Sequence, residues 1–461
     1  MVYIVIWLIV LAASVFLFQQ ASGRLSLVRP NLHSLIFYYS LLLSSFIGSL
    51  LIVLNIDHSY IIVKLIFQEK SRQIGFSLVC IVMVLLPLTM FVISKLSGFH
   101  PRHEFDRYWN SPVVESLSKR EQDTFYRIFF ALSVICLGSI LYTFLRIEHV
   151  PIFEAFLNPD ANLSELRIEA KEGFKGISAY LRNIFAIGLT PILSLIAYAY
   201  KVKTKEPKWA ILFAVLFAAS VLINIYDFQK SPVIFYIASF ILLRMYLGKT
   251  KMSLKKFLVF VVLAFSYLLV MYASLGVKDA KEYLSYSSGP IGRIILTQIA
   301  PMYAYVDRYD EVYPFLEERG LPQALLELYH IDQVRSSRVL MEDLFPERIE
   351  AGTAGVLNTL YVGEAYATYG VPGVILGTIM IGVFIQLLYM VFLRLPKHPV
   401  FLSLFIYFMI NIPRALVGGF SDLILNPVWF MLSAIVVSSY VFVQLRHRFI
   451  GYLGYRKERN T

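Results

Sequence analysis

The chain has 461 residues, of which 58% are hydrophobic and 16% charged, and its mean hydropathy is +0.66. Ordinary soluble domains are roughly 45–50% apolar, so this composition excludes a soluble globular protein and predicts a multi-pass membrane protein. The formal net charge of +11 does not indicate a nucleic-acid partner. The basic residues gather in short loops between apolar runs, as the positive-inside rule expects.

Continuous apolar runs predict an all-α membrane bundle of about eleven transmembrane helices, because roughly 20 apolar residues cross the hydrocarbon core. A β-barrel would show alternation instead of continuous runs. The run at the N-terminus lacks the basic region and cleavage site of a signal peptide, so it is taken as the first span. The predicted spans are 2–18, 35–54, 76–94, 127–146, 184–200, 209–226, 232–247, 256–276, 371–393, 400–418 and 424–444.

Loop charges give the orientation of these spans. Lysines gather in the loops at 201–208 and 249–256. Basic residues also occur in the loop at 394–397 and in the C-terminal tail. If the spans alternate, these loops all lie on one side, which is then cytoplasmic. The C-terminus is expected inside and the N-terminus outside. An extra crossing at the short apolar segment 59–67 would move the N-terminus inside.

Metal and disulfide chemistry find little support in the sequence. His100 and His103 have a spacing that could suit a metal, but a solvated loop is the favoured interpretation. Cys80 and Cys136 lie inside apolar runs, where small packing residues are expected. The motifs of P-loop, zinc-protease, CxxC and nucleophile-elbow proteins are missing from the sequence. We therefore expect no metal and no cofactor.

Basic residues occur in the first outer loop, residues 147–183, where the positive-inside rule disfavours them. On a helix, Arg167, Lys171 and Lys175 would lie on one face as like charges, which is unfavourable unless an anion sits between them. A diphosphate-binding surface and a solvated surface helix both remain open. Lys230, in a tight polar turn, is expected near the outer mouth of the bundle, although it could also snorkel to the interface.

A second outer loop, residues 277–370, has 94 residues with 14 acidic and 8 basic side chains. Loops of this length are usually functional, and we expect a folded helical cap. The spacing of Leu321, Leu325 and Leu328 predicts an amphipathic helix within it. Arg293 and Gln298 lie in an apolar stretch of this loop, where a structural ion pair is the alternative to a substrate-binding role.

Two charges lie at the edges of predicted spans. Glu364 precedes the apolar run that begins at Val371, and Arg414 follows Pro413 near the outer end of another run. A charge at the centre of a span costs roughly 2.5–3.5 kcal/mol on insertion scales, and such residues are functional candidates by default. On these grounds Arg414 is the strongest single candidate.

The segment GTAGVLNTLYVGEAYATYGVPGVILG, together with RIEAKEGFKG, Lys230 and IPRALVGGFSD, resembles the corresponding parts of the Wzy-type O-antigen polymerases. The layout of many spans with one large outer loop before the last three is similar along the whole chain. The resemblance implies a glycosyltransferase of the bacterial inner (plasma) membrane whose active site faces the periplasm.

In that family, undecaprenyl-diphosphate-linked oligosaccharide repeat units serve as donor and acceptor and are joined into a surface polysaccharide such as the O-antigen of lipopolysaccharide. A flippase and a chain-length regulator are the partners that the resemblance implies. Two alternatives stay open, a lipid-linked oligosaccharide flippase or exporter and an O-antigen ligase. Transporters commonly carry paired internal repeats, and none is visible in this chain.

The resulting hypothesis is a cluster at the outer mouth of a single integral membrane domain, residues 1–461. Arginine forks suit phosphate oxygens, and cations at a poorly hydrated site stabilise a leaving diphosphate. Glu364 would orient a cation or the acceptor hydroxyl, or form a structural ion pair. The predicted catalytic residues are Arg414, Glu364 and Arg293, and the predicted substrate-binding residues are Arg167, Lys171, Lys230, Gln298 and Tyr361.

Overall fold

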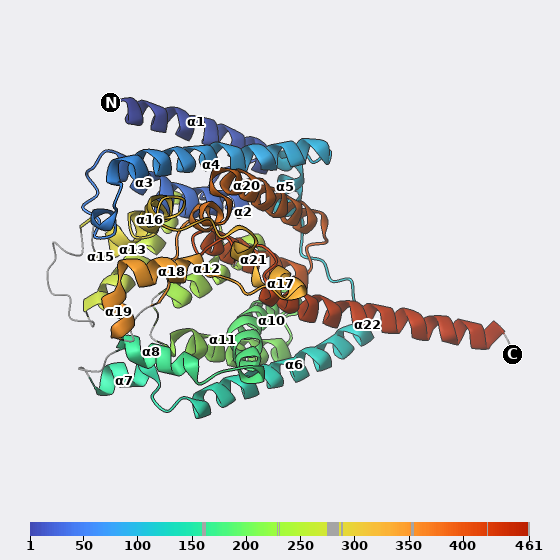
Figure 1. Ribbon diagram of the computed structural model, residues 1–461. Coiled ribbons are helices and arrows are strands. Elements are labelled where there is room, and N and C mark those ends of the chain that lie inside the picture. The colour runs from blue at the N-terminus through green and yellow to red at the C-terminus, as the bar shows by residue number, and fades with distance from the viewer. Residues whose placement is uncertain are drawn as a thin grey trace. The chain divides into compact units, whose positions relative to one another are not determined.

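The computed structural model describes residues 1–158, 163–227, 229, 231–273, 285–286, 289–351, 355–421 and 423–459, and helices make up most of these ranges (Figure 1). No named β-strand occurs in these ranges, where Tyr309 and Tyr313 form an isolated bridge. The predicted all-α fold class is therefore confirmed.

The chain forms two compact units. Unit 1 comprises residues 1–110, 251–394 and 408–426, and unit 2 comprises residues 111–250, 395–407 and 427–461. The helix α21 (Pro399–Leu416) gives its first half to unit 2 and its second half to unit 1. The expected single integral domain stays a prediction.

In unit 1, α4 packs against both α1 and α20, and Figure 1 shows α1 and α4 running side by side. The helices of this unit are α1 (Val2–Ser22), α2 (Leu32–Leu35), η1 (Ile36–Phe46), α3 (Ile47–Val53), η2 (Ile62–Lys64), α4 (Gln68–Leu96), α5 (Pro101–Asn110), α13 (Leu254–Ala273), α15 (Gly289–Ile295), α16 (Ala300–Arg308), η4 (Glu317–Gly320), α17 (Gln323–Leu326), η5 (Glu327–Tyr329), α18 (Ser336–Leu344), α19 (Pro346–Glu350) and α20 (Val362–Arg394).

In unit 2, an aromatic core joins α6, α10, α11 and α22, with the rings of Tyr200 and Trp209 stacked at 4.3 Å between centroids. The helices of this unit, besides the first half of α21, are α6 (Lys119–Arg146), α7 (Pro151–Leu157), α8 (Leu163–Glu172), α9 (Ile177–Tyr180), η3 (Leu181–Leu189), α10 (Thr190–Thr204), α11 (Pro207–Ile225), α12 (Ser231–Tyr246) and α22 (Pro427–Arg459).

Within the described ranges, nine helices are long and apolar enough to cross a membrane. Each span predicted from the sequence overlaps helical residues, and the span 232–247 corresponds to the apolar α12, which has 16 residues. Residues 59–67 contain only the single turn η2, so they add no crossing between α3 and α4. The protein is therefore a polytopic helical membrane protein.

Local sequence explains where several helices begin. Ser118 caps α6 by accepting from Glu121 N, while the Glu121 carboxylate accepts from Ser118 N at 2.6 Å. This reciprocal capping box satisfies two donors that the first turn leaves open. Pro151 and Pro207 occupy the first positions of α7 and α11, where a missing amide proton costs nothing.

A buried acid, Asp307, joins α16 to the start of α4. Its carboxylate accepts from Ile66 N at 2.8 Å, from Phe67 N at 2.7 Å and from Ser71 Oγ at 2.9 Å. The neighbouring Arg308 pairs with Asp307 and donates to Asp343 Oδ2 of α18 at 2.7 Å. These bonds anchor α16 within unit 1, because unpaired buried charges would be costly.

Two details of the outer loops differ from the sequence predictions. The helix α8 ends at Glu172, so Lys175 lies beyond it and the predicted three-residue stack of like charges is wrong. In the second loop, α17 has four residues and continues as the short η5, so Leu328 is 73% exposed while Leu326 is buried. The described part of residues 277–370 contains several short helices joined by turns and irregular segments, and its role as an outer cap stays a prediction.

The short connection between α20 and α21 contains a buried lysine. Lys397 is 4% exposed, and its Nζ donates to Ser111 O at 3.1 Å. Beside it, His398 Nε2 lies 3.2 Å from Glu115 Oε1 and 3.3 Å from Tyr200 OH. Burial lowers the pKa of Lys397 from 10.5 to about 8.

The turn between α10 and α11 tests the orientation. A phosphatase reporter fused after Lys205, which ends α10 with a φ of 60°, should be inactive, because the lysines around this turn predict that it lies in the cytoplasm. A matched fusion after the exposed Lys175 should be active, since it lies in the first outer loop. An active phosphatase after Lys205 would refute the predicted topology.

The buried Lys397 gives a pH-dependent stability. Because its folded pKa is about 8 and its ordinary value 10.5, the unfolded state binds more protons between these values, and the free energy of unfolding rises with pH across this window. The charge therefore costs on the order of 3 kcal/mol near neutral pH. In thermal unfolding experiments in detergent, Lys397→Met should be more stable than the wild-type protein at pH 7. Its stability should not rise between pH 8 and pH 10, whereas that of the wild-type protein should. Lys249→Met, at an exposed position, should keep the wild-type profile, and a rise that persists in Lys397→Met would contradict this assignment.

Candidate functional site

A short helical segment carries Glu364 at the start of α20. The backbone of α20 kinks at Tyr369, with φ −141°, and Gly370, with φ 61°. The kink separates residues 362–368 from the apolar part of the helix, and every residue of this segment is buried. Leu316 N donates to Ala367 O at 2.9 Å, which fixes the segment to the residues that follow α16 in unit 1.

The Glu364 carboxylate is buried, with 4% of the residue exposed. Its Oε2 accepts from Ser421 N at 3.0 Å and from Ser421 Oγ at 2.8 Å. Gly419 has a φ of 137°, and a Cβ atom added there would lie 2.7 Å from Glu364 Oε1. The Gly-Gly-Phe-Ser loop after α21 therefore forms a close-fitting cradle for this carboxylate, because only glycine admits both the backbone angle and the contact.

The predicted residues Tyr361 and Arg414 belong to the same region of unit 1. Tyr361 is buried, its N donates to Leu416 O at 2.8 Å, and its hydroxyl lies 2.9 Å from Thr378 Oγ1. Arg414, two residues before Leu416, is half-buried and donates from Nη1 to Asn411 Oδ1 at 3.2 Å. The start of α20 and the end of α21 thus meet, and they bring a carboxylate and a guanidinium to one end of two apolar helices.

Gln298 and Arg293 lie on the segment that leads into α16. The Gln298 carbonyl accepts from Thr359 Oγ1 at 2.8 Å, which places its backbone beside the residues just before α20. Arg293 lies on α15 with an exposed side chain, and α15 packs against η1. The helix η1 also reaches the end of α21, because Ser40 Oγ donates to Pro413 O at 2.7 Å.

The remaining predicted cations belong to unit 2. Arg167 donates from Nε to Asp227 O at 2.8 Å, so it binds the polar turn that precedes Lys230 in the chain. Lys171 lies in α8, but its side chain and the whole of Lys230 fall outside the described residues. The convergence of these three cations with the Glu364 group therefore stays a prediction.

Several polar residues of unit 1 are not found by the sequence reasoning. Ser421 lies in the segment IPRALVGGFSD, but its bond to Glu364 depends on a tertiary contact across 57 positions. Tyr305 and Tyr309 are four residues apart, and this helical spacing is visible in the sequence. His33 is fully buried, with Nε2 2.7 Å from Gln386 Oε1. Such side-chain pairs hold neighbouring membrane helices together, and we assign His33 a structural role.

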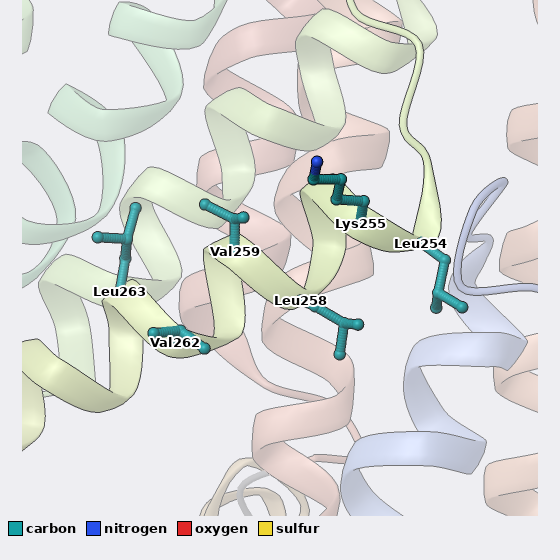
Figure 2. Close-up of a pocket in the computed structure, with 6 residues that line it drawn as sticks. All are labelled: Leu254, Lys255, Leu258, Val259, Val262 and Leu263. Carbon is teal, nitrogen blue, oxygen red and sulfur yellow. The ribbon is translucent and has the colours of Figure 1, made fainter.

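An apolar hollow runs along α13, and Figure 2 shows its lining side chains on successive turns of the helix. None of the described side chains of α13 is buried, and Leu258 and Val262 are 53% and 61% exposed. Apart from Lys255, the lining offers no polar side chain that would orient a substrate. This face suits contact with lipid tails, and the candidate site is the Glu364 region.

The chemistry available at the Glu364 region is that of a fixed carboxylate near an arginine and several tyrosines. Among the described residues, no group of three or more His, Cys, Asp or Glu side chains is arranged to hold a metal ion. Cys80 and Cys136 are free thiols. The carboxylate can accept a hydrogen bond from a hydroxyl, and the guanidinium can bind an anion.

Comparisons of the chain with protein-family models, with curated proteins and with solved structures find no match.

The cradle around Glu364 predicts a large cost for a small substitution. Gly419→Ala should lower the free energy of unfolding by about 1–3 kcal/mol, because the new Cβ adopts a strained backbone angle and displaces a buried, hydrogen-bonded carboxylate. Gly138→Ala is the control, since an added Cβ there meets nothing within 4 Å and lies inside α6. This control should be neutral or stabilising by about 0.5–1 kcal/mol. Thermal unfolding in detergent compares the two variants. A Gly419→Ala protein that unfolds at the wild-type temperature would disprove the close contact between Gly419 and Glu364.

Proposed function

We propose that this chain is a membrane glycosyltransferase that polymerises undecaprenyl-diphosphate-linked oligosaccharide repeat units into a surface polysaccharide. The reaction would take place on the periplasmic side of a bacterial inner membrane. The observation that carries the proposal is that the junction of two membrane-length helices, α20 and α21, carries both a buried carboxylate, Glu364, and a half-buried arginine, Arg414. The sequence resemblance supplies the substrate class.

The bonds made and broken are those of a glycosyl transfer. A hydroxyl oxygen at the non-reducing end of one repeat unit bonds to the anomeric carbon of the growing chain, and the bond from that carbon to the diphosphate oxygen breaks. Undecaprenyl diphosphate leaves with the bonding electrons, and the hydroxyl proton is released through Glu364 or water. The diphosphate linkage stores the driving force, so no nucleotide is consumed.

Arg414 would bind the diphosphate as negative charge accumulates on the leaving oxygen. Fixed cations in a poorly hydrated site stabilise such charge strongly. Arg293 is the further cation of the proposed clamp in unit 1, and the roles of Arg167, Lys171 and Lys230 stay predictions from the sequence. Gln298 and Tyr361 would contribute polar contacts to the sugars, and a chain-length regulator and a flippase would act before or beside the polymerase.

Glu364 would hold the acceptor hydroxyl. Its carboxylate is fixed by Ser421 through two hydrogen bonds to Oε2, of 3.0 Å from N and 2.8 Å from Oγ. A hydroxyl attacking an activated anomeric carbon needs little help from a base, and general-base catalysis typically contributes about 10²–10⁴-fold. Orientation of the acceptor is therefore the main role that we propose for this carboxylate.

Loss of the protein should separate the three candidate activities. Cells that lack it should accumulate single lipid-linked repeat units on the outer face of the membrane and cap their surface glycolipid with one repeat. Accumulation on the inner face would instead indicate a flippase. Surface glycolipid without any repeat would indicate a ligase. Either of these two results would overturn the proposal.

Substitution of Arg414 tests the diphosphate contact. Arg414→Ala should reduce polymerisation by about 10²–10³-fold, the range seen when one charge-stabilising donor is removed, while the protein stays in the membrane at normal levels. Arg414→Lys should also be poor, because an ammonium group lacks the two-pronged geometry of guanidinium. Arg338→Ala is the matched control, since Arg338 forms an exposed ion pair with Glu342 at 2.7 Å on α18, and exposed pairs contribute little. Normal polymer from Arg414→Ala would exclude the clamp.

A further inference from the structure

A hollow of about 550 Å³ lies at the surface of unit 1, along the first turns of α4. Its volume falls within the roughly 300–1,000 Å³ of small-molecule binding sites. Phe67 is 40% exposed, and the four polar residues of the lining are exposed as well. A ligand can therefore reach these groups directly from the surrounding solution. The residues that line the hollow are Phe67, Gln68, Glu69, Lys70, Gln73 and Ile74.

The hollow lies where α4 would leave the hydrocarbon core of a membrane. This helix has 29 residues, which span about 43 Å, whereas the core is about 30 Å thick. The polar residues 68–73 come first, and the apolar run follows from Ile74. The ring of Tyr3, in the first turn of the largely exposed α1, meets that of Phe76 with centroids 5.5 Å apart. The polar first turns of α4 thus extend past the apolar part of the bundle.

The hollow and the Glu364 segment lie at the same end of two parallel helices. Near the starts of α4 and α20, Lys70 interacts electrostatically with Tyr366. Near their ends, Gln386 Nε2 donates to Ser94 Oγ at 2.8 Å. The hollow is therefore on the side of the membrane that carries the candidate site, which is the outer side in the predicted orientation.

The charges around the hollow favour a neutral ligand. Asp307 already accepts from the two backbone amides just before α4, so an acid faces this helix start. Lys70 forms an ion pair with Glu311, and Glu69 adds a further negative charge to the lining. A phosphate group would meet more acids than bases here, whereas an uncharged polar ligand would not be repelled.

We propose that this hollow binds sugar rings of a lipid-linked repeat unit, with the Phe67 ring against the C–H face of a sugar and the amides of Gln68 and Gln73 bonded to its hydroxyl groups. This inference rests on the proposed function and deepens it by naming a saccharide subsite outside the Glu364 region. An aromatic ring offers a large and rigid apolar surface. An amide side chain both donates and accepts hydrogen bonds, as a hydroxyl group does. The subsite would hold the repeat unit close to the membrane surface, at the level where the sugars of a lipid-linked substrate begin.

The test measures binding of the free oligosaccharide. Mild acid releases it from the lipid-linked repeat units that accumulate in cells lacking the protein. Its Kd for the purified protein is determined by saturation-transfer difference NMR in phosphatidylcholine nanodiscs, because detergents with sugar headgroups would compete. Phe67→Ala should raise the Kd about tenfold, and Gln73→Ala about fivefold, the equivalent of one neutral hydrogen bond. Both side chains are exposed, so the melting temperatures should stay close to the wild-type value.

Tyr329→Ala and Gln323→Ala are the matched controls. Tyr329 is 73% exposed on η5, and Gln323 is exposed at the start of α17. Both residues belong to unit 1, and neither lines the hollow. These variants remove an aromatic ring and an amide elsewhere on the surface, and they should keep the wild-type Kd.

Two results would overturn the saccharide subsite while leaving the proposed function intact. In the first, the wild-type protein polymerises lipid-linked repeats but the free oligosaccharide gives no binding signal. In the second, Phe67→Ala and Gln73→Ala bind the oligosaccharide as tightly as the two control variants. A wild-type protein that makes no polymer from lipid-linked repeats would overturn the proposed function itself.

Discussion

The kink at Tyr369 and Gly370 is the constraint on which the candidate site depends. Gly370 has a φ of 61°, and a Cβ there would lie 2.9 Å from the Phe315 ring. A side chain at this position would therefore face both backbone strain and a clash. The kink separates residues 362–368 from the membrane-length part of the helix, and this segment packs against the residues that follow α16, where Glu364 is buried.

A buried carboxylate must be compensated, and the loop after α21 supplies the compensation. Ser421 offers both its amide and its hydroxyl to the same oxygen of Glu364, while Gly419 allows the loop to approach the carboxylate. The two helices that meet at this point are connected through Tyr361 N and Leu416 O. Burial of the acid and the junction of α20 with α21 thus stabilise each other, since separating the helices would leave the charge without its partners.

The sequence predicts the features that depend on local composition. Apolar runs identify the spans because length and continuity alone decide whether a helix can cross a bilayer, and the apolar part of α20 does begin at Val371, directly after the kink. Predictions based on helix faces were less successful. The face containing Leu328 does not exist because α17 and η5 are too short, and Lys175 lies past the end of α8. Helix ends in polar loops depend on tertiary packing, which periodicity does not contain.

Side chains that act through a partner far away in the sequence are the hardest to predict. The glycines and serine of IPRALVGGFSD are visible in the sequence, but the acid they surround lies more than fifty positions earlier. The tyrosines of α16 are equally visible, whereas the partner of the Tyr303 hydroxyl, Ser49, lies 254 positions earlier in the chain. Residue identity alone therefore indicates the chemistry that a segment can offer. The tertiary contacts decide which of its groups are already satisfied and which remain available to a substrate.

A membrane protein has few places where charge can be held out of water at low cost. The centre of a span is the most expensive, and the ends of spans are cheaper because backbone and side-chain donors are available there. Glu364 lies at the start of one apolar helix and Arg414 near the end of another, each with a polar partner, Ser421 or Asn411. Opposite charges held at such ends are already oriented and partly desolvated. A reaction that builds up charge on a leaving group gains most from groups that need no reorganisation at the moment of bond breaking. The same geometry that makes these two residues tolerable in a membrane therefore also suits the charge-stabilising role that we propose for them.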